Sequence, residues 1–232
     1  MMKLATVSGL VAVLCLAGAA SAATIYVDLM GANGPTVGDS IWNNYTVTNN
    51  NLAPSAVLVD TTGTTTGITI AETKMFNYGG QTATSVATGT AIEFAPAGTG
   101  AAYGDTTLAL GSGKDPQLTL TGLTKGVEYT FSFYAQRNGG SETSVRNTII
   151  TLTSGENTAS VTVNGYNTSS VSSMGVTSIV ADSDTIVLDF STDAENRYFY
   201  LNAFKMAYVP EPATMRLLGI GGIAALLKRR RK

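Results

Sequence analysis

The 232 residues include no histidine. Imidazole is the base in Ser-His-Asp and Cys-His catalysis and a common metal ligand, so both types of catalysis and every histidine metal site are excluded. Cysteine is almost as scarce, because Cys15 is the only one. It lies in an N-terminal apolar run that we expect to be removed. The mature protein is then predicted to have no disulfide, no thiolate metal site and no cysteine nucleophile.

Charged residues are also few, at 13 % of the chain, and they are unevenly distributed. Residues 23–209 carry seven Lys or Arg against fifteen Asp or Glu, whereas residues 210–232 carry six basic residues and one acidic residue. Nucleic-acid binding needs a clustered basic face that neutralises phosphates. An acidic body with scattered cations therefore predicts no nucleic-acid partner.

The first 22 residues have the three parts of an export signal. Lys3 supplies the positive start, Leu10–Leu16 the apolar stretch, and Ala20 and Ala22 the small residues of a cleavage site. This run is too short for a permanent membrane span, which needs about 20 apolar residues. We expect a helical signal peptide over residues 1–22, used by the Sec export machinery and cleaved after Ala22, with cleavage after Ala23 as the near alternative.

The last 24 residues join a Pro-Glu-Pro motif to an apolar run and a basic block. Pro210, Glu211 and Pro212 come first, and Leu217–Leu227 follows as eleven uncharged, mostly apolar residues. As a helix this run is about 16 Å long. The basic block is Lys228, Arg229, Arg230, Arg231 and Lys232. Anionic cytoplasmic lipid attracts such a block, so the body is expected on the opposite side of the membrane.

This order of parts resembles the PEP-CTERM sorting tail of Gram-negative bacteria. The resemblance implies recognition by exosortase, a membrane-embedded, transpeptidase-like processing enzyme, at or near Pro210-Glu211-Pro212. It also implies a transient anchor in the inner membrane, followed by transfer of the body to the cell surface or the extracellular matrix. Glu211 would then be read by the partner enzyme. The alternative is an amphipathic tail whose charges are simply solvated.

Between these two ends, apolar residues recur with a period of two. Tyr129, Phe131 and Phe133 alternate with Thr130 and Ser132, which predicts a strand with one buried face. No stretch has ten residues of helical apolar spacing with caps. Further strands are predicted at Thr24–Leu29, Ala56–Asp60, Ile68–Glu72, Gln117–Leu120, Asn147–Leu152, Ala159–Val163, Thr185–Phe190 and Tyr198–Ala207.

These strands predict an all-β fold, an antiparallel two-sheet β-sandwich of jelly-roll type over residues 23–208. The signal helix precedes it, and a short C-terminal transmembrane helix follows within the sorting and anchor segment, residues 209–232. Three short pieces also resemble a jelly-roll domain common in PEP-CTERM proteins of planctomycete and verrucomicrobial type, which is similar to galactose-binding-like modules. They are Trp42-Asn43-Asn44, Leu118–Leu123 leading into Tyr129-Thr130-Phe131, and Tyr200–Phe204.

Trp42 and Asn43 are candidate glycan-binding residues. An aromatic face stacks on a pyranose ring, and an amide gives directional hydrogen bonds to its hydroxyls. The alternative is that Trp42 plugs the interior of the sandwich and the tyrosines lie on strand faces. The other aromatic residues expected in or near loops are Tyr45, Tyr78, Tyr103 and Tyr166.

Two further features raise the question of chemistry. Asp182 and Asp184 are weak candidates for a structural calcium site, although their spacing is not that of an EF-hand and a turn before Thr185 is the simpler interpretation. Gly38-Asp39-Ser40 resembles the opening block of GDSL-type esterases, but without histidine Ser40 has no base. Apart from that calcium, no cofactor and no catalytic residue are expected.

The sequence therefore favours an exported, non-catalytic surface or extracellular-matrix protein sorted by exosortase. A carbohydrate-binding module acting on extracellular polysaccharide is the alternative function. A third hypothesis is a glycosidase with paired carboxylates, whose two acids would have to lie about 5–10 Å apart in a cleft.

Overall fold

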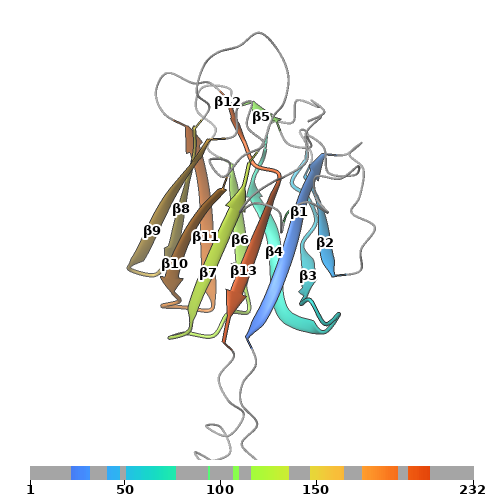
Figure 1. Cartoon of the computed structure of the whole chain (residues 1–232), viewed down its shortest axis with the longest axis vertical. Helices are drawn as coiled ribbons and strands as arrows, with labels where there is room; N and C mark the ends of the chain where they lie inside the picture. The colour runs from blue at the N-terminus through green and yellow to red at the C-terminus, as the bar shows by residue number, and fades with distance from the viewer. Residues whose placement is uncertain are drawn as a thin grey trace, which may run out of the picture. The chain divides into compact units, whose positions relative to one another are not determined.

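Two β-sheets face each other across a hydrophobic core (Figure 1). The computed structural model describes residues 22–31, 41–47, 51–76, 94, 107–109, 116–135, 147–164, 174–192 and 198–209. The regular elements within these ranges are β1 (Ala23–Gly31), β2 (Trp42–Val47), β3 (Ala56–Val59), β4 (Thr65–Lys74), β5 (Thr107–Ala109), β6 (Gln117–Thr121), β7 (Glu128–Tyr134), β8 (Asn147–Ser154), β9 (Asn157–Asn164), β10 (Met174–Val180), β11 (Thr185–Thr192), β12 (Tyr198–Tyr200) and β13 (Ala203–Tyr208).

Sheet A has the strand order β10-β7-β13-β1-β2, and sheet B has the order β3-β4-β6-β11-β8-β9. A short separate pair joins β12 to β5. Among the described pairings only β1 with β2 is parallel, with Tyr26 in register with Trp42. The all-β, two-sheet prediction is confirmed, but the expectation of purely antiparallel sheets is wrong at this pair. The jelly-roll connectivity stays a prediction.

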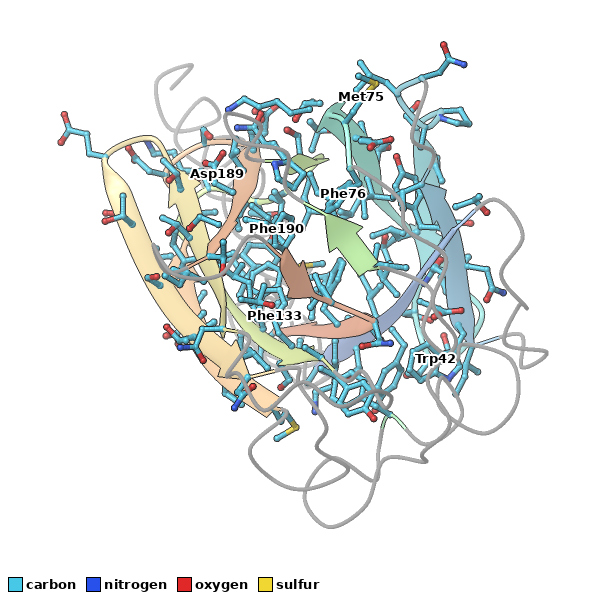
Figure 2. The ribbon with its side chains drawn as sticks, turned by 90° about the horizontal axis from the view of Figure 1, so that it is seen from above. Trp42, Met75, Phe76, Phe133, Asp189 and Phe190 are labelled. Atoms are coloured by element: carbon cyan, nitrogen blue, oxygen red, sulfur yellow. The ribbon has the colours of Figure 1, made fainter. Side chains whose placement is uncertain are left out.

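Alternating side chains build the core between the sheets. In β8, Ile150 and Leu152 are fully buried, whereas Thr151 and Thr153 on the other face are half-buried. Burying each large apolar side chain contributes about 1.5–3 kcal/mol relative to leaving it in water. Aromatic rings fill the middle of the core, where Phe76, Phe133 and Phe190 lie between the layers (Figure 2).

Three strands, β2, β5 and β10, were not predicted, and one predicted strand is broken. β2 carries two adjacent asparagines and β10 a glycine, and these residue types disfavour strands unless tertiary contacts support them. The predicted strand Tyr198–Ala207 is divided at Leu201 and Asn202 into β12 and β13. Here the Asn202 N–H donates to the Tyr134 carbonyl, and the Asn202 carbonyl accepts from the Leu29 N–H, both at 2.9 Å.

The first and last strands of the sandwich are neighbours in the middle of sheet A. β1 pairs antiparallel with β13, and Ala23 is in register with Tyr208. The chain therefore enters β1 and leaves β13 at the same end of the sandwich, the lower end in Figure 1. Ala23–Tyr208 forms one compact unit.

The two expected terminal helices fall almost entirely in residues 1–21 and 210–232, outside the described residues. In the part of the chain that the structure describes, no helix has the length and hydropathy needed to cross a membrane.

Gly122 allows β4 and β6 to come together at a tight bend. Its φ of +83° lies in the left-handed region, and a Cβ there would overlap the carbonyl oxygen of Gly67 in β4. Gly126 has a similar φ of +85°, but a Cβ there would meet nothing within 4 Å. The two glycines therefore share a backbone requirement and differ in the space around them.

Substituting these two glycines separates backbone strain from steric overlap. We expect Gly126→Ala to lower the free energy of unfolding by about 1–2 kcal/mol, the cost of the left-handed conformation. Gly122→Ala should cost about 1–3 kcal/mol more, because the Gly67 backbone must move. Urea denaturation of both variants measures the difference. Equal losses would contradict the close approach of Gly122 to Gly67.

Candidate functional site

The sandwich ends immediately before the predicted sorting motif. Tyr208, the last residue of β13, packs its ring on Tyr129 with 5.0 Å between centroids. Burial raises the pKa of the Tyr208 hydroxyl, and the nearby Tyr129 and Asp60 raise it further. The next residue, Val209, is 57 % exposed. The described chain therefore changes from a packed strand to an exposed residue in one step.

The predicted processing residues themselves are mostly not described. Ala22 is exposed at the start of the described chain. Ala20, the motif Pro210-Glu211-Pro212 and the basic block Lys228–Lys232 lie outside the described residues, so their roles stay predictions. Ser40, Tyr78, Tyr103 and Tyr166 also lie outside them.

Trp42 lies in a strand and is buried, with 5 % of its surface exposed. Its ring packs against Tyr26, with 4.9 Å between centroids, and edge-on against Phe94 at 6.4 Å. Phe94 in turn stacks on Tyr134 at 5.4 Å, with 8° between the ring planes. Together with Ala203, Trp42, Phe94 and Tyr134 form what we call the outer cluster.

The outer cluster covers the outside of sheet A. Alternation along β2 turns Tyr45 and Val47 toward the core and Trp42 to the opposite face, and Figure 2 shows Trp42 to one side of the core phenylalanines. The expected loop position is therefore wrong, and so is the alternative that Trp42 plugs the space between the sheets. Glycan binding by Trp42 stays untested, but the buried ring has little surface to stack on a sugar.

Asn43 connects the neighbouring edges of the two sheets. Its Nδ2 donates to the carbonyl of Tyr26 in β1 at 2.8 Å and to the carbonyl of Val59 in β3 at 2.9 Å. Its Oδ1 accepts from the Val59 N–H at 2.8 Å. An amide has two N–H donors, and both are used here by backbone groups. This geometry favours a structural role for Asn43, and its role in glycan binding stays a prediction.

Glu72 and Tyr45 make a second polar connection between the sheets. The Glu72 carboxylate is buried and accepts from two backbone groups, the N–H of Ala53 at 2.6 Å and the N–H of Phe76 at 2.7 Å. The Glu72 N–H donates to the Tyr45 hydroxyl at 2.8 Å. Burial raises the pKa of Glu72 despite these two hydrogen bonds, and it raises the pKa of Tyr45 to about 12.

Neither member of this pair was predicted as a polar bridge. Tyr45 was expected near a loop, but it lies in β2 with its ring in the core. A signal for Glu72 was present in the sequence, because Ile68, Ile70 and Glu72 share one face of a strand with period two. A carboxylate on the apolar face must find hydrogen-bond donors, and here they are backbone amides.

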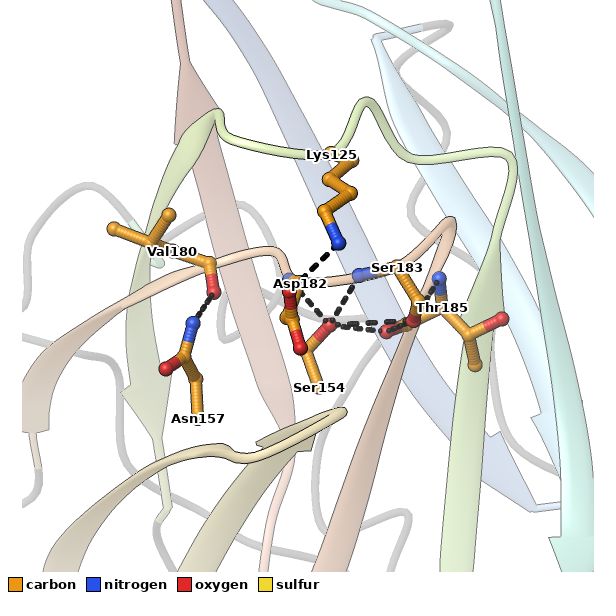
Figure 3. Close-up of polar contacts among 7 residues, drawn as sticks. All are labelled: Lys125, Ser154, Asn157, Val180, Asp182, Ser183 and Thr185. Atoms are coloured by element: carbon orange, nitrogen blue, oxygen red, sulfur yellow. Dashed lines mark hydrogen bonds and ion pairs between the residues drawn. The ribbon is translucent and has the colours of Figure 1, made fainter.

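Ser154 organises the polar contacts between the β8–β9 turn and the segment between β10 and β11 (Figure 3). Its hydroxyl donates to the Thr185 carbonyl at 2.6 Å and accepts from the Asp182 N–H at 3.0 Å. Asn157, just after the β8–β9 turn, donates through Nδ2 to the Val180 carbonyl at 2.9 Å. These bonds hold the β8–β9 turn against the segment between β10 and β11.

The two calcium candidates lie in this network and have other partners. Asp182 Oδ1 is 2.9 Å from Lys125 Nζ, and this ion pair, with a backbone bond from Glu156, holds the Asp182 pKa below its usual value. Asp184 Oδ1 accepts from the Thr185 hydroxyl at 3.0 Å. Within the described ranges no group of three or more acidic, histidine or cysteine side chains could hold a metal. Calcium binding stays a prediction, and the contacts match the turn alternative.

Comparisons with known proteins identify a C-terminal motif and a distant similarity among solved structures. Residues 209–232 match the PEP-CTERM protein-sorting motif. No curated protein matches the sequence. Among solved structures, "CBM35 from Cellvibrio japonicus Abf62" aligns over 60 % of this chain and 91 % of its own length, with 14 % identity and a TM-score of 0.32.

Removing the Asn43 bridge should destabilise the sandwich. Asn43→Ala leaves two carbonyls and one N–H without their partner, so we expect the free energy of unfolding to fall by at least about 2 kcal/mol. Thr46→Ala, in the same strand, is the matched control and should cost less than about 1 kcal/mol. Chemical denaturation measures both. A loss at Asn43 no larger than that at Thr46 would argue against the bridge.

Glu72 should make the stability depend on pH. Its pKa in the folded protein is raised above the ordinary value of 4.5, so its contribution to stability is complete below pH 4.5 and declines as the pH rises through the folded-state pKa. We expect Glu72→Gln to destabilise the protein by about 1–3 kcal/mol, because one N–H then faces an amide donor. The advantage of the wild type over this variant should shrink as the pH rises above 4.5 and through the folded-state pKa.

Urea titrations at several pH values test this dependence. Glu128→Gln, at the exposed start of β7, also removes one negative charge and should change the free energy of unfolding by less than about 0.5 kcal/mol. If the difference between wild type and Glu72→Gln grew with pH, the assigned direction of the Glu72 pKa would be wrong.

Proposed function

We propose that this protein is an exported, non-catalytic surface or matrix protein that exosortase processes through its C-terminal tail. The observation that carries the proposal is the match of residues 209–232 to the PEP-CTERM protein-sorting motif. The tail has its motif, apolar run and basic block in the expected order. At the other end, residues 1–22 have the parts of an export signal.

The topology of the body supports this route. A signal peptide enters with its N-terminus on the cytoplasmic side, and positive-inside logic leaves the basic C-terminus on that side as well. A body connected to both segments must start and end near the same membrane surface. Ala23 and Tyr208 are register partners in one antiparallel pair, so the body meets this requirement without a long connecting loop.

The proposed partners follow from this route. The Sec machinery translocates the chain, the inner membrane holds the tail transiently, and exosortase acts at or near Pro210-Glu211-Pro212. The body then reaches the cell surface or the extracellular matrix. There its proposed partner is extracellular polysaccharide. The lack of histidine and, after signal removal, of cysteine supports a non-catalytic role.

The carbohydrate-binding alternative has less support from the two residues that suggested it. Trp42 is buried in the outer cluster, and the amide of Asn43 is used by backbone groups. A glycan contact would therefore have to use other side chains. Binding of extracellular polysaccharide in a pull-down, retained by Trp42→Ala with an intact fold, would indicate such a site.

Intact mass of the protein from the producing cell tests the proposed sorting. We expect wild-type protein to lack residues 1–22 and part of residues 209–232. A variant with Pro210→Ala, Glu211→Gln and Pro212→Ala should lose the signal peptide, keep its full tail and remain in the membrane fraction. The control, Glu156→Gln, lies in the β8–β9 turn and should be processed like wild type.

Two outcomes would contradict the proposed sorting. Equal C-terminal processing of wild type and the triple variant would show that the motif is not read. Recovery of the unprocessed chain from the cytosol would contradict export altogether.

A further inference from the structure

The first three residues of β1 depend on the last strand of the sandwich. Ala23, Thr24 and Ile25 are in register with Tyr208, Ala207 and Met206 of β13. The other neighbour, β2, begins to pair with β1 only at Tyr26. On that side, the described hydrogen bond is the one from the Thr61 N–H to the Thr24 carbonyl, at 2.9 Å.

The order of synthesis and export makes this dependence important. Translocation proceeds from the N-terminus, so β13 is the last strand of the body to leave the membrane. Until residues 203–208 emerge, Ala23–Ile25 have no neighbouring strand in sheet A. The expected cleavage point, the bond between Ala22 and Ala23, therefore lies next to an unpaired segment throughout most of export.

Docking of β13 pairs and partly buries Ala23–Ile25. Ile25 then becomes fully buried, and β1 becomes an interior strand with neighbours on both sides. A protease binds its substrate as an extended segment through backbone hydrogen bonds, in the same way as strand addition. A segment whose backbone is already paired within a sheet cannot make those bonds at the same time.

The two ends of the body differ in this respect. Val209 follows the last residue of β13 and is 57 % exposed, so the described chain has already left the sheet at this residue. Completing the sandwich therefore restricts access to the Ala22–Ala23 bond, whereas the pairing of β13 ends at Tyr208. The strand pair therefore bears on access to the Ala22–Ala23 bond.

We propose that the docking of β13 onto β1 closes the Ala22–Ala23 bond to signal peptidase, so that signal cleavage precedes completion of the sandwich. The reaction is hydrolysis of the Ala22–Ala23 amide. Water adds across this bond, leaving a carboxylate on Ala22 and a protonated amine on Ala23. The proposal rests on the proposed function, which supplies the signal peptide and the sorting tail.

A reversible lock on the strand pair tests this order. Thr24 and Ala207 are register partners, and antiparallel partners have Cα atoms about 4.5–5.5 Å apart, within the disulfide range of about 4.4–6.8 Å. The full-length precursor would carry Thr24→Cys and Ala207→Cys together with Cys15→Ala, so that the new pair contains the only thiols. Purified signal peptidase in detergent is then added to the folded, oxidised precursor and to the same precursor after reduction.

The matched control locks a strand pair that does not include β1. Thr130 in β7 and Ser178 in β10 are register partners whose hydroxyl oxygens are 2.8 Å apart. Thr130→Cys with Ser178→Cys, again with Cys15→Ala, therefore places a comparable disulfide between two strands of sheet A. Circular dichroism of both precursors checks that each retains the β fold before and after oxidation.

The expected result is slower cleavage only when β1 is locked. Oxidation of the Thr24–Ala207 pair should slow cleavage by at least about 10-fold, because local opening of the pair is prevented. Oxidation of the control pair should change the rate by less than about twofold, because β1 can still open. Equal rates for the oxidised and reduced Thr24–Ala207 precursor would overturn the proposal.

A second measurement uses the wild-type precursor without new cysteines. Precursor diluted from urea directly into peptidase should be cleaved faster than precursor that is allowed to fold first. Equal rates, or no cleavage under either condition, would overturn the proposal. Tail processing by exosortase is read separately from the C-terminal mass, so a failure of the sorting hypothesis is distinguishable from a failure of this order.

Discussion

The antiparallel pair of β1 and β13 is the constraint on which the rest of the structure depends. It places the first and last strands of the body side by side in the middle of sheet A, with Ala23 opposite Tyr208. Interior strands bury apolar side chains on the core face, here including Ile25 and Met206. The ends of the domain are therefore part of its core rather than loosely attached. Ala23 and Tyr208 therefore lie at the same end of the sandwich.

Polar side chains connect separate elements of the sandwich. Asn43 connects the edge strands β2 and β3. Glu72 accepts hydrogen bonds from the backbone amides of Ala53 and Phe76, and Ser154 connects the end of β8 to the start of β11. In each case a side chain satisfies backbone groups that lie wholly or partly out of water. These hydrogen bonds form only when the two elements that they connect have already packed together. They make the closed sandwich specific, whereas the driving force comes from the burial of aromatic and aliphatic side chains.

Sequence patterns predicted much of the fold and little of the candidate site. Alternation was sufficient for strands such as β7 and β8, because a half-buried strand imposes a period of two on its residues. Alternation failed for β2, where Asn43 is held by hydrogen bonds to β1 and β3. It also predicted β12 and β13 as one strand, because the interruption at Leu201 and Asn202 does not change the hydropathy pattern. Trp42 was expected between the sheets or in a loop, and its actual place depends on Phe94, more than fifty residues away.

The amino-acid sequence by itself determined the excluded chemistries, the all-β class and the sorting motif at residues 209–232. These follow from composition, from local periodicity and from a short contiguous signal, none of which requires distant parts of the chain to meet. Only the tertiary structure decided that the two ends of the body lie together, that Trp42 is buried outside sheet A and that Asn43 serves the backbone. These depend on strand order and register, which are set by the packing of whole sheets and are not encoded in any one segment.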